Sequence, residues 1–146
     1  MLMELYSIEF DEIFQNITLL FIALALPFMT AWERESSSRS AGLRTFPLVS
    51  MAACTFTILA TSLFDDQRAQ ANIIAGIITG IGFIGGGAIL KSSSEVSGTS
   101  TAAAIWSTGA VGIAVGLGRI EIAIALSIMT FATLTLIGRV KKDLLK

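Results

Sequence analysis

The residues that could do chemistry in this chain are its carboxylates, since its 146 residues include no histidine and one cysteine, Cys54. Without histidine, an imidazole base, a histidine metal site and a serine–histidine pair are excluded. A single cysteine excludes an internal disulfide and multi-cysteine metal sites, and we expect Cys54 to be an apolar packing residue. Asp65 and Asp66 form an adjacent acidic pair, which either binds Mg²⁺ weakly through water or, more commonly, solvates a turn. These two are weak metal candidates, and no cofactor is predicted.

The long apolar stretches contain no Asp, Glu, Lys or Arg at their centres, which limits the chemistry further. Ionisable groups at bilayer depth cost about 2.5–3.5 kcal/mol each and are kept where ions or protons move. The nearest charges, Glu33, Lys91 and Glu121, stand at the ends of such stretches, and we expect Glu121 to pair with Arg119. An enzyme and a proton-coupled pump are therefore disfavoured, whereas a channel lined by carbonyl and hydroxyl groups needs no charge.

The composition places these groups in a membrane protein. Hydrophobic residues make up 53% of the chain and charged residues 14%, against about 25% charged in soluble domains. Crossing a bilayer takes about 20 helical residues, and five stretches are long enough: 13–32, 46–64, 71–90, 101–118 and 120–138. Backbone groups in lipid must be satisfied internally, which favours helices. We predict an all-α membrane protein, a compact bundle of five transmembrane helices forming a single domain over residues 1–146.

The basic residues predict the orientation of this bundle. With five spans, one side of the membrane receives Arg34, Arg39, Arg44, Lys91, Arg139, Lys141, Lys142 and Lys146, and the other only Arg68 and Arg119. The positive-inside rule then places the N-terminus outside and the C-terminus in the cytoplasm. The acidic first twelve residues do not resemble a signal peptide, and they form either a short interfacial helix or a frayed terminus. A net charge of −1 predicts no nucleic-acid partner.

Prolines and polar residues predict where helices begin, bend and end. Pro27 should kink the first span, and Pro47 suits the start of the second, with Thr45 as its cap. The polar segment Glu35–Ser40 is expected to be a loop.

Glycines predict how the helices pack. Ten of the thirteen lie in the third and fourth spans, and closely spaced small residues let membrane helices approach one another. The third span carries them on two faces, so we predict that it is the central helix. A run of three glycines in the third span either packs in this way or breaks the helix, as in transporters. The predicted packing residues are Gly76, Gly80, Gly82, Gly85, Gly86, Gly87, Gly109, Gly112 and Gly116.

Four blocks of residues carry a family resemblance. Trp32–Glu35 ends the first span, Ala41–Val49 enters the second, Gly80–Ile89 lies in the third, and Val96–Trp106 leads into the fourth, before the glycine-rich Gly112–Gly116. In this order they resemble the membrane domain of the MgtC/SapB family, with its patterns L-E-R-E, A-G-L-R-T-x-x-L-V, G-I-G-F-L-G-A-G-V-I and V-R-G-L-T-T-A-A-T-L-W. Departures from these patterns indicate a divergent member, and we expect no soluble C-terminal domain in this chain.

The resemblance implies a multi-pass protein of the bacterial inner membrane. The family is linked to magnesium limitation and to regulation of the F-type ATP synthase. It implies a cytoplasmic collar of Glu33, Arg34, Gly42, Arg44, Thr45 and Trp106, in which we predict a Glu33–Arg44 ion pair.

Two hypotheses of function follow. The first is a non-enzymatic regulatory or structural subunit that contacts itself, as a homo-oligomer, or a larger membrane complex through its helices in the lipid bilayer. The alternative is a small channel or transporter component for Mg²⁺ or a monovalent cation.

Overall fold

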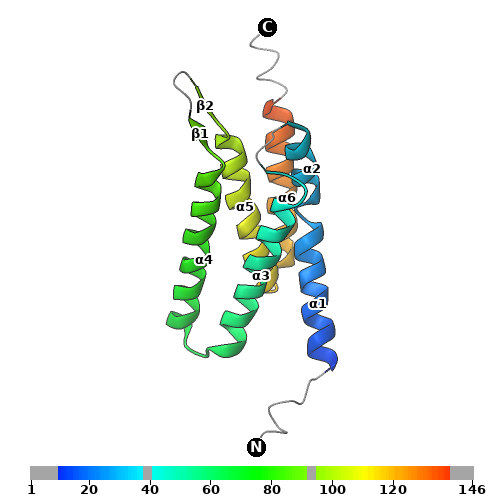
Figure 1. Ribbon diagram of the computed structural model, residues 1–146. Helices are drawn as coiled ribbons and strands as arrows, with labels where there is room; N and C mark the ends of the chain where they lie inside the picture. The colour runs from blue at the N-terminus through cyan, green and yellow to red at the C-terminus, as the bar shows by residue number, and fades with distance from the viewer. Residues whose placement is uncertain (1–9, 38–40, 92–94, 139–146) are drawn as a thin grey trace, which may run out of the picture.

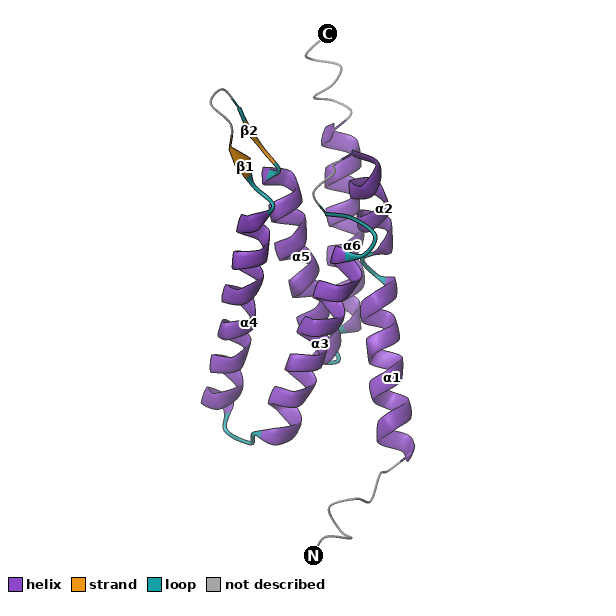
Figure 2. Cartoon of the chain, viewed as in Figure 1, coloured by secondary structure: helices purple, strands orange, loops and turns teal. Residues whose placement is uncertain are grey.

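Helices make up nearly all of the described chain, as its long apolar stretches predict (Figure 1). The computed structural model describes residues 10–37, 41–91 and 95–138. Its helices are α1 (Phe10–Ala25), α2 (Phe28–Ser37), α3 (Thr45–Leu63), α4 (Gln67–Gly87), α5 (Thr99–Gly116) and α6 (Ile120–Ala132), which continues as a π-helical turn, η2 (Thr133–Ile137). Two short strands, β1 (Leu90–Lys91) and β2 (Val96–Ser97), form an antiparallel ribbon between α4 and α5, drawn in orange in Figure 2.

Four helical segments are long and apolar enough to cross a membrane: Phe10–Ser37, Thr45–Leu63, Gln67–Gly87 and Ile120–Ile137. They correspond to the first, second, third and fifth predicted spans. The fourth predicted span is α5, a helix of 18 residues that is not one of these four, because its threonines, serines and glycines lower its hydropathy. The all-helical fold is therefore confirmed, with four helices that could each cross a membrane, whereas the fifth crossing stays a prediction. The expected interfacial helix at the N-terminus falls mostly on residues 1–9, which lie outside the described residues.

The centre of the bundle is α5, so the prediction that the third span is central was wrong. Helix α5 contacts α1, α3, α4 and α6, and buried residues run along it from Thr101 to Val115. On α4, the third span, only Ile81 and Gly85 are buried. The alanines, glycines and hydroxyl residues of α5 let neighbours approach from several sides, whereas α4 packs along one side only.

Pro27 interrupts the first span, as predicted. Helix α1 ends at Ala25 and α2 begins at Phe28, because proline lacks the N–H that a helix needs and its ring disturbs the preceding turn. The hydroxyl of Ser127 on α6 donates a hydrogen bond of 2.5 Å to the carbonyl of Leu26. This bond satisfies a backbone acceptor at the kink and fixes α6 against it.

The start of α3 differs from the prediction. Thr45 is its first helical residue rather than its cap, and the capping position is Arg44, which makes no side-chain capping bond. The entering turn instead forms a backbone bond of 3.2 Å from the N–H of Phe46 to the carbonyl of Gly42. Pro47 lies in the first turn, where its missing N–H costs little, as expected.

The two ends of the bundle carry different charged residues. One end holds the C-terminal ends of α2 and η2 together with the β1–β2 ribbon (Figure 1). The opposite end holds the start of α1, the loop between α3 and α4, and the turn between α5 and α6. Arg34 and Lys91 therefore lie toward the first end, and Arg68 and Arg119 toward the second.

Candidate functional site

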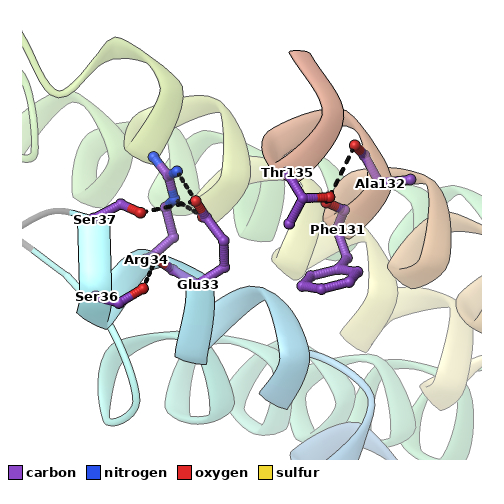
Figure 3. A network of polar contacts seen from close by, with 7 residues as sticks. All are labelled: Glu33, Arg34, Ser36, Ser37, Phe131, Ala132 and Thr135. Atoms are coloured by element: carbon purple, nitrogen blue, oxygen red, sulfur yellow. Dashed lines mark hydrogen bonds and ion pairs between the residues drawn. The ribbon is translucent and has the colours of Figure 1, made fainter. Parts of the chain in front are cut away.

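The charged cluster of α2 is a closed ion pair between neighbouring residues (Figure 3). The guanidinium of Arg34 donates from Nε and Nη2 to the two carboxylate oxygens of Glu33, at 2.5 and 2.6 Å. The hydroxyl of Ser37 donates to the same carboxylate at 2.9 Å. The side chains of Arg34 and Glu33 are only 11% and 15% exposed. The structure thus shows a partner for Glu33 other than the predicted Arg44, which is exposed. A carboxylate held at both oxygens by a guanidinium is poorly placed to act as a base.

Glu35 anchors the loop between α2 and α3. Its Oε2 atom accepts a hydrogen bond of 2.9 Å from the N–H of Leu43. A Cβ added to Gly42 would lie 2.0 Å from this oxygen, so the carboxylate occupies the space that a larger residue needs. The loop was predicted to begin at Glu35, but α2 continues to Ser37. The rest of the predicted loop, residues 38–40, lies outside the described residues. Sequence reasoning missed this role of Glu35, which depends on a contact across eight residues of chain.

The residues of the implied collar come from three different helices and the loop between two of them. Glu33, Arg34 and Gly42 lie around the α2–α3 connection, together with the start of α3 at Thr45. Trp106 instead lies within α5, where its half-exposed ring lines a groove beside α4.

One residue of the acidic pair, Asp66, caps the start of α4. Asp66 is its N-cap, and its Oδ1 atom accepts a hydrogen bond of 3.0 Å from the N–H of Arg68. Asp65 is exposed beside it. The part of the chain that the structure describes contains no group of three or more histidine, cysteine or acidic residues suited to hold a metal ion. The geometry of Asp66 supports the turn-forming interpretation of the pair.

The glycines of α5 lie in close helix contacts. A Cβ added to Gly112 would lie 2.1 Å from the carbonyl oxygen of Ser50 on α3, and one on Gly116 would lie 2.8 Å from that of Cys54. Gly109 faces the side chain of Ile81 on α4. Only glycine permits α3 to approach α5 this closely, since any side chain would meet the backbone of α3.

The glycines of α4 have a different environment. Gly85 faces the backbone of Ala102 on α5, at 3.1 Å from an added Cβ. The run of three glycines forms the last turn of α4 rather than a break within it. The remaining glycines face open space, with no atom within 4 Å of an added Cβ: Gly76, Gly80, Gly82, Gly86 and Gly87. This helix was predicted to pack on two faces, but within the chain it packs on one face only.

Two apolar grooves run beside α4. One lies between α3 and α4, has a volume of about 520 Å³, and is lined by aliphatic, phenylalanine and glycine residues. The other lies between α4, α5 and the start of α6, has a volume of about 290 Å³, and includes Trp106 and Arg119 in its lining.

The buried polar side chains of the described residues are all hydroxyls, namely Thr30, Ser50, Thr57, Thr101, Thr108 and Ser127. The Oγ atom of Ser50 is buried without a hydrogen-bond partner. Ser107 links two helices, since its Oγ lies 2.6 Å from Oγ1 of Thr130 on α6. The hydroxyl of Thr79 instead donates to the carbonyl of Ala75 on its own helix.

Comparison with known proteins gives consistent matches. The model of the MgtC family matches residues 20–143. The chain is similar to "Protein MgtC" of Brucella abortus, with 37% identity over 75% of this chain and 46% of that protein. It is 38% identical to the "Putative magnesium transporter YhiD" of Escherichia coli K12, over 70% of this chain and 51% of that protein. Similarity to "Protein MgtC" of Salmonella typhimurium is 35% identity over 80% of this chain and 49% of that protein.

The chain spans about half the length of these relatives. No solved structure matches it.

Proposed function

The chain belongs to the MgtC family, and on this basis we propose that it is a non-enzymatic subunit of a bacterial inner membrane. Its lipid-facing helices contact a second copy or another membrane complex, and this contact regulates or supports the partner. The process that it serves is adaptation to magnesium limitation, with the F-type ATP synthase as a candidate complex. The name of one relative, "Putative magnesium transporter YhiD", refers to magnesium, which supports a link to this process.

The proposed topology has five crossings, with α5 as the fourth. Helix α5 is long enough for this, because 18 residues at about 1.5 Å per residue extend roughly 27 Å. Neighbouring helices bury Thr101 and Thr108 and partly bury Ser107, whereas the exposed Thr99 and Ser100 stand at the start of the helix, so low hydropathy is tolerated. Arg34 and Lys91 lie toward one end of the bundle and Arg68 and Arg119 toward the other. Together with the basic C-terminal segment, this asymmetry supports an external N-terminus and a cytoplasmic C-terminus.

The observation that carries the proposal is the outer face of α4. Glycines along this helix have open space where a side chain would stand, and Phe83 between them is 86% exposed. Membrane helices associate through close backbone packing and hydrogen bonds, since lipid provides no hydrophobic force between them. An accessible backbone along one whole helix suits a partner helix.

Photo-crosslinking in native membranes tests this contact. A crosslinking amino acid at Thr79 or Phe83, both exposed on α4, should capture a second copy or one defined membrane protein. The matched controls are Phe14 and Phe21, which are 75% and 70% exposed on α1 and should give far weaker products. Equal labelling from α1 and α4, or none from α4, would contradict the proposal.

Cation passage is the second candidate function. It is supported by the hydroxyl side chains inside the bundle, among them the unpartnered Oγ of Ser50, because hydroxyl and carbonyl oxygens are ligands for hard cations. A Mg²⁺ or monovalent cation flux into liposomes that falls in Ser50→Ala would support it. Folded protein that admits none of these cations would exclude it.

A further inference from the structure

The groove between α4 and α5 has the length of one membrane leaflet. Its lining on α5 runs from Trp106 to Leu117, a separation of eleven helical steps and therefore about 16 Å at 1.5 Å per residue. Half of a hydrocarbon core of about 30 Å is about 15 Å. Ile74, Ile78 and Ile81 of α4 form the opposite wall. The groove between the two helices is therefore apolar along this length and fits an acyl chain.

The mouth of this groove is charged. Arg119 lines it at the turn between α5 and α6, and its Nε donates to Oε1 of Glu121 at 2.6 Å. Both side chains are largely exposed, at 61% and 63%. Gly118, with φ of +71°, forms the turn that places Arg119 there. Because apolar helices flank this turn, the two charges must lie at a membrane surface.

We propose that the groove binds phosphatidylethanolamine, with an acyl chain between α4 and α5 and the headgroup on Arg119 and Glu121. The guanidinium makes no other hydrogen bond in the described part of the chain, so its Nη groups are available to the lipid phosphate. The carboxylate of Glu121 accepts hydrogen bonds from the primary ammonium of the same headgroup. This inference goes beyond the proposed function and uses only its placement of the α5–α6 turn at a membrane surface.

The paired charges select this lipid over the other common ones. Phosphatidylglycerol offers a phosphate but no cation for Glu121, so the carboxylate repels it. Phosphatidylcholine has a quaternary ammonium, which has no N–H to donate. The larger groove between α3 and α4 has no charged residue in its lining and so has no means of recognising a headgroup.

Trp106 provides a direct measurement, because it lines the groove. The 146-residue chain with Trp32→Phe keeps Trp106 as its single tryptophan. It is reconstituted in phosphatidylcholine nanodiscs with a small fraction of phosphatidylethanolamine, phosphatidylglycerol or phosphatidylcholine that carries bromine deep in one acyl chain. Bromine quenches tryptophan only at short range, so quenching of Trp106 measures occupancy of the groove.

We expect brominated phosphatidylethanolamine to quench Trp106 with about threefold higher apparent affinity than either other lipid. This factor is the gain in affinity expected from two exposed charge contacts. Arg119→Gln should remove this preference. Glu121→Gln should shift it to phosphatidylglycerol, because the guanidinium then stands without its carboxylate. Arg68→Gln, a matched change of an exposed arginine outside the groove lining, should leave it unchanged.

A block of the groove separates chain binding from headgroup binding. Ala110 lines this groove, and Ala110→Phe should lower quenching by all three lipids. Ala52 lines the groove between α3 and α4, so Ala52→Phe should not.

Equal quenching of Trp106 by the three lipids, or a preference that survives Arg119→Gln, would overturn the proposal. The Trp106→Phe variant keeps Trp32, which is 64% exposed, and reports membrane embedding alone. If Trp32 is quenched and Trp106 is not, the lipid site is wrong. If neither is quenched, the membrane placement itself is wrong.

Discussion

Replacing Gly112 of α5 with alanine adds a single heavy atom, Cβ, at the centre of the bundle. The added Cβ would lie 2.1 Å from the carbonyl oxygen of Ser50 and 2.9 Å from the Cβ of Ala53. Since Cβ contacts below 3.0 Å are essentially never seen, α3 must move away by about 1 Å. The obstacle is backbone, so no side-chain rotation relieves it.

The magnitude follows from two opposing effects. Overpacking of a tight contact costs about 3 kcal/mol at the upper end of its usual range, and alanine regains about 1 kcal/mol over glycine within a helix. We therefore expect Gly112→Ala to lower the free energy of unfolding by about 2 kcal/mol. Gly80→Ala is the matched control, because an added Cβ there meets no atom within 4 Å. It should raise the free energy of unfolding by about 0.5–1 kcal/mol.

The assay is reversible unfolding of purified protein by SDS in mild detergent, followed by circular dichroism. The two variants should change the stability in opposite directions. Wild-type stability in Gly112→Ala would refute the close approach of α3 and α5. A loss in Gly80→Ala as large as that in Gly112→Ala would refute the assignment of open space to the outer face of α4.

Three further predictions use the same unfolding measurement. Ser127→Ala removes the bond at the kink of the first span and should cost about 0.6 kcal/mol, as single bonds between membrane helices usually do. Gly98→Ala combines φ of +84° with a contact of 2.0 Å to backbone and should cost more than Gly118→Ala, where φ of +71° alone costs about 1–2 kcal/mol. Asp66→Ala removes the N-cap of α4 and should cost about 1 kcal/mol, whereas Asp65→Ala should cost little. A stabilisation of the wild type by Mg²⁺ that Asp65→Ala abolishes would instead establish a metal site at this pair.

Helix positions could be predicted from the sequence because each depends on local properties. The five apolar stretches predicted five helical segments, with bounds that differ by a few residues at each end. Pro27 predicted the break in the first span for a covalent reason, the missing N–H. The ion pair of Arg119 with Glu121 was also predictable, since both stand alone between two apolar stretches.

Contacts that depend on side-chain orientation and on the path of a turn were not predictable in this way. The prediction that Thr45 caps α3 was wrong, because backbone hydrogen bonds in the preceding turn take the place of a side-chain cap. The predicted Arg44 partner of Glu33 was wrong, because the carboxylate pairs with the adjacent Arg34 on the same helix, whereas Arg44 is exposed. The anchoring of Leu43 by Glu35 left no signal in the sequence at all.

The sequence by itself determined which segments are helices and that they belong in a membrane, because hydropathy and span length are sums over neighbouring residues. Only the tertiary structure decided which helix is central. Small residues on α4 and α5 permit close approach equally well, and nothing in their spacing says whether a protein helix or lipid occupies the space. The fold placed α3, α4 and α6 against α5, and it left most glycines of α4 facing outward.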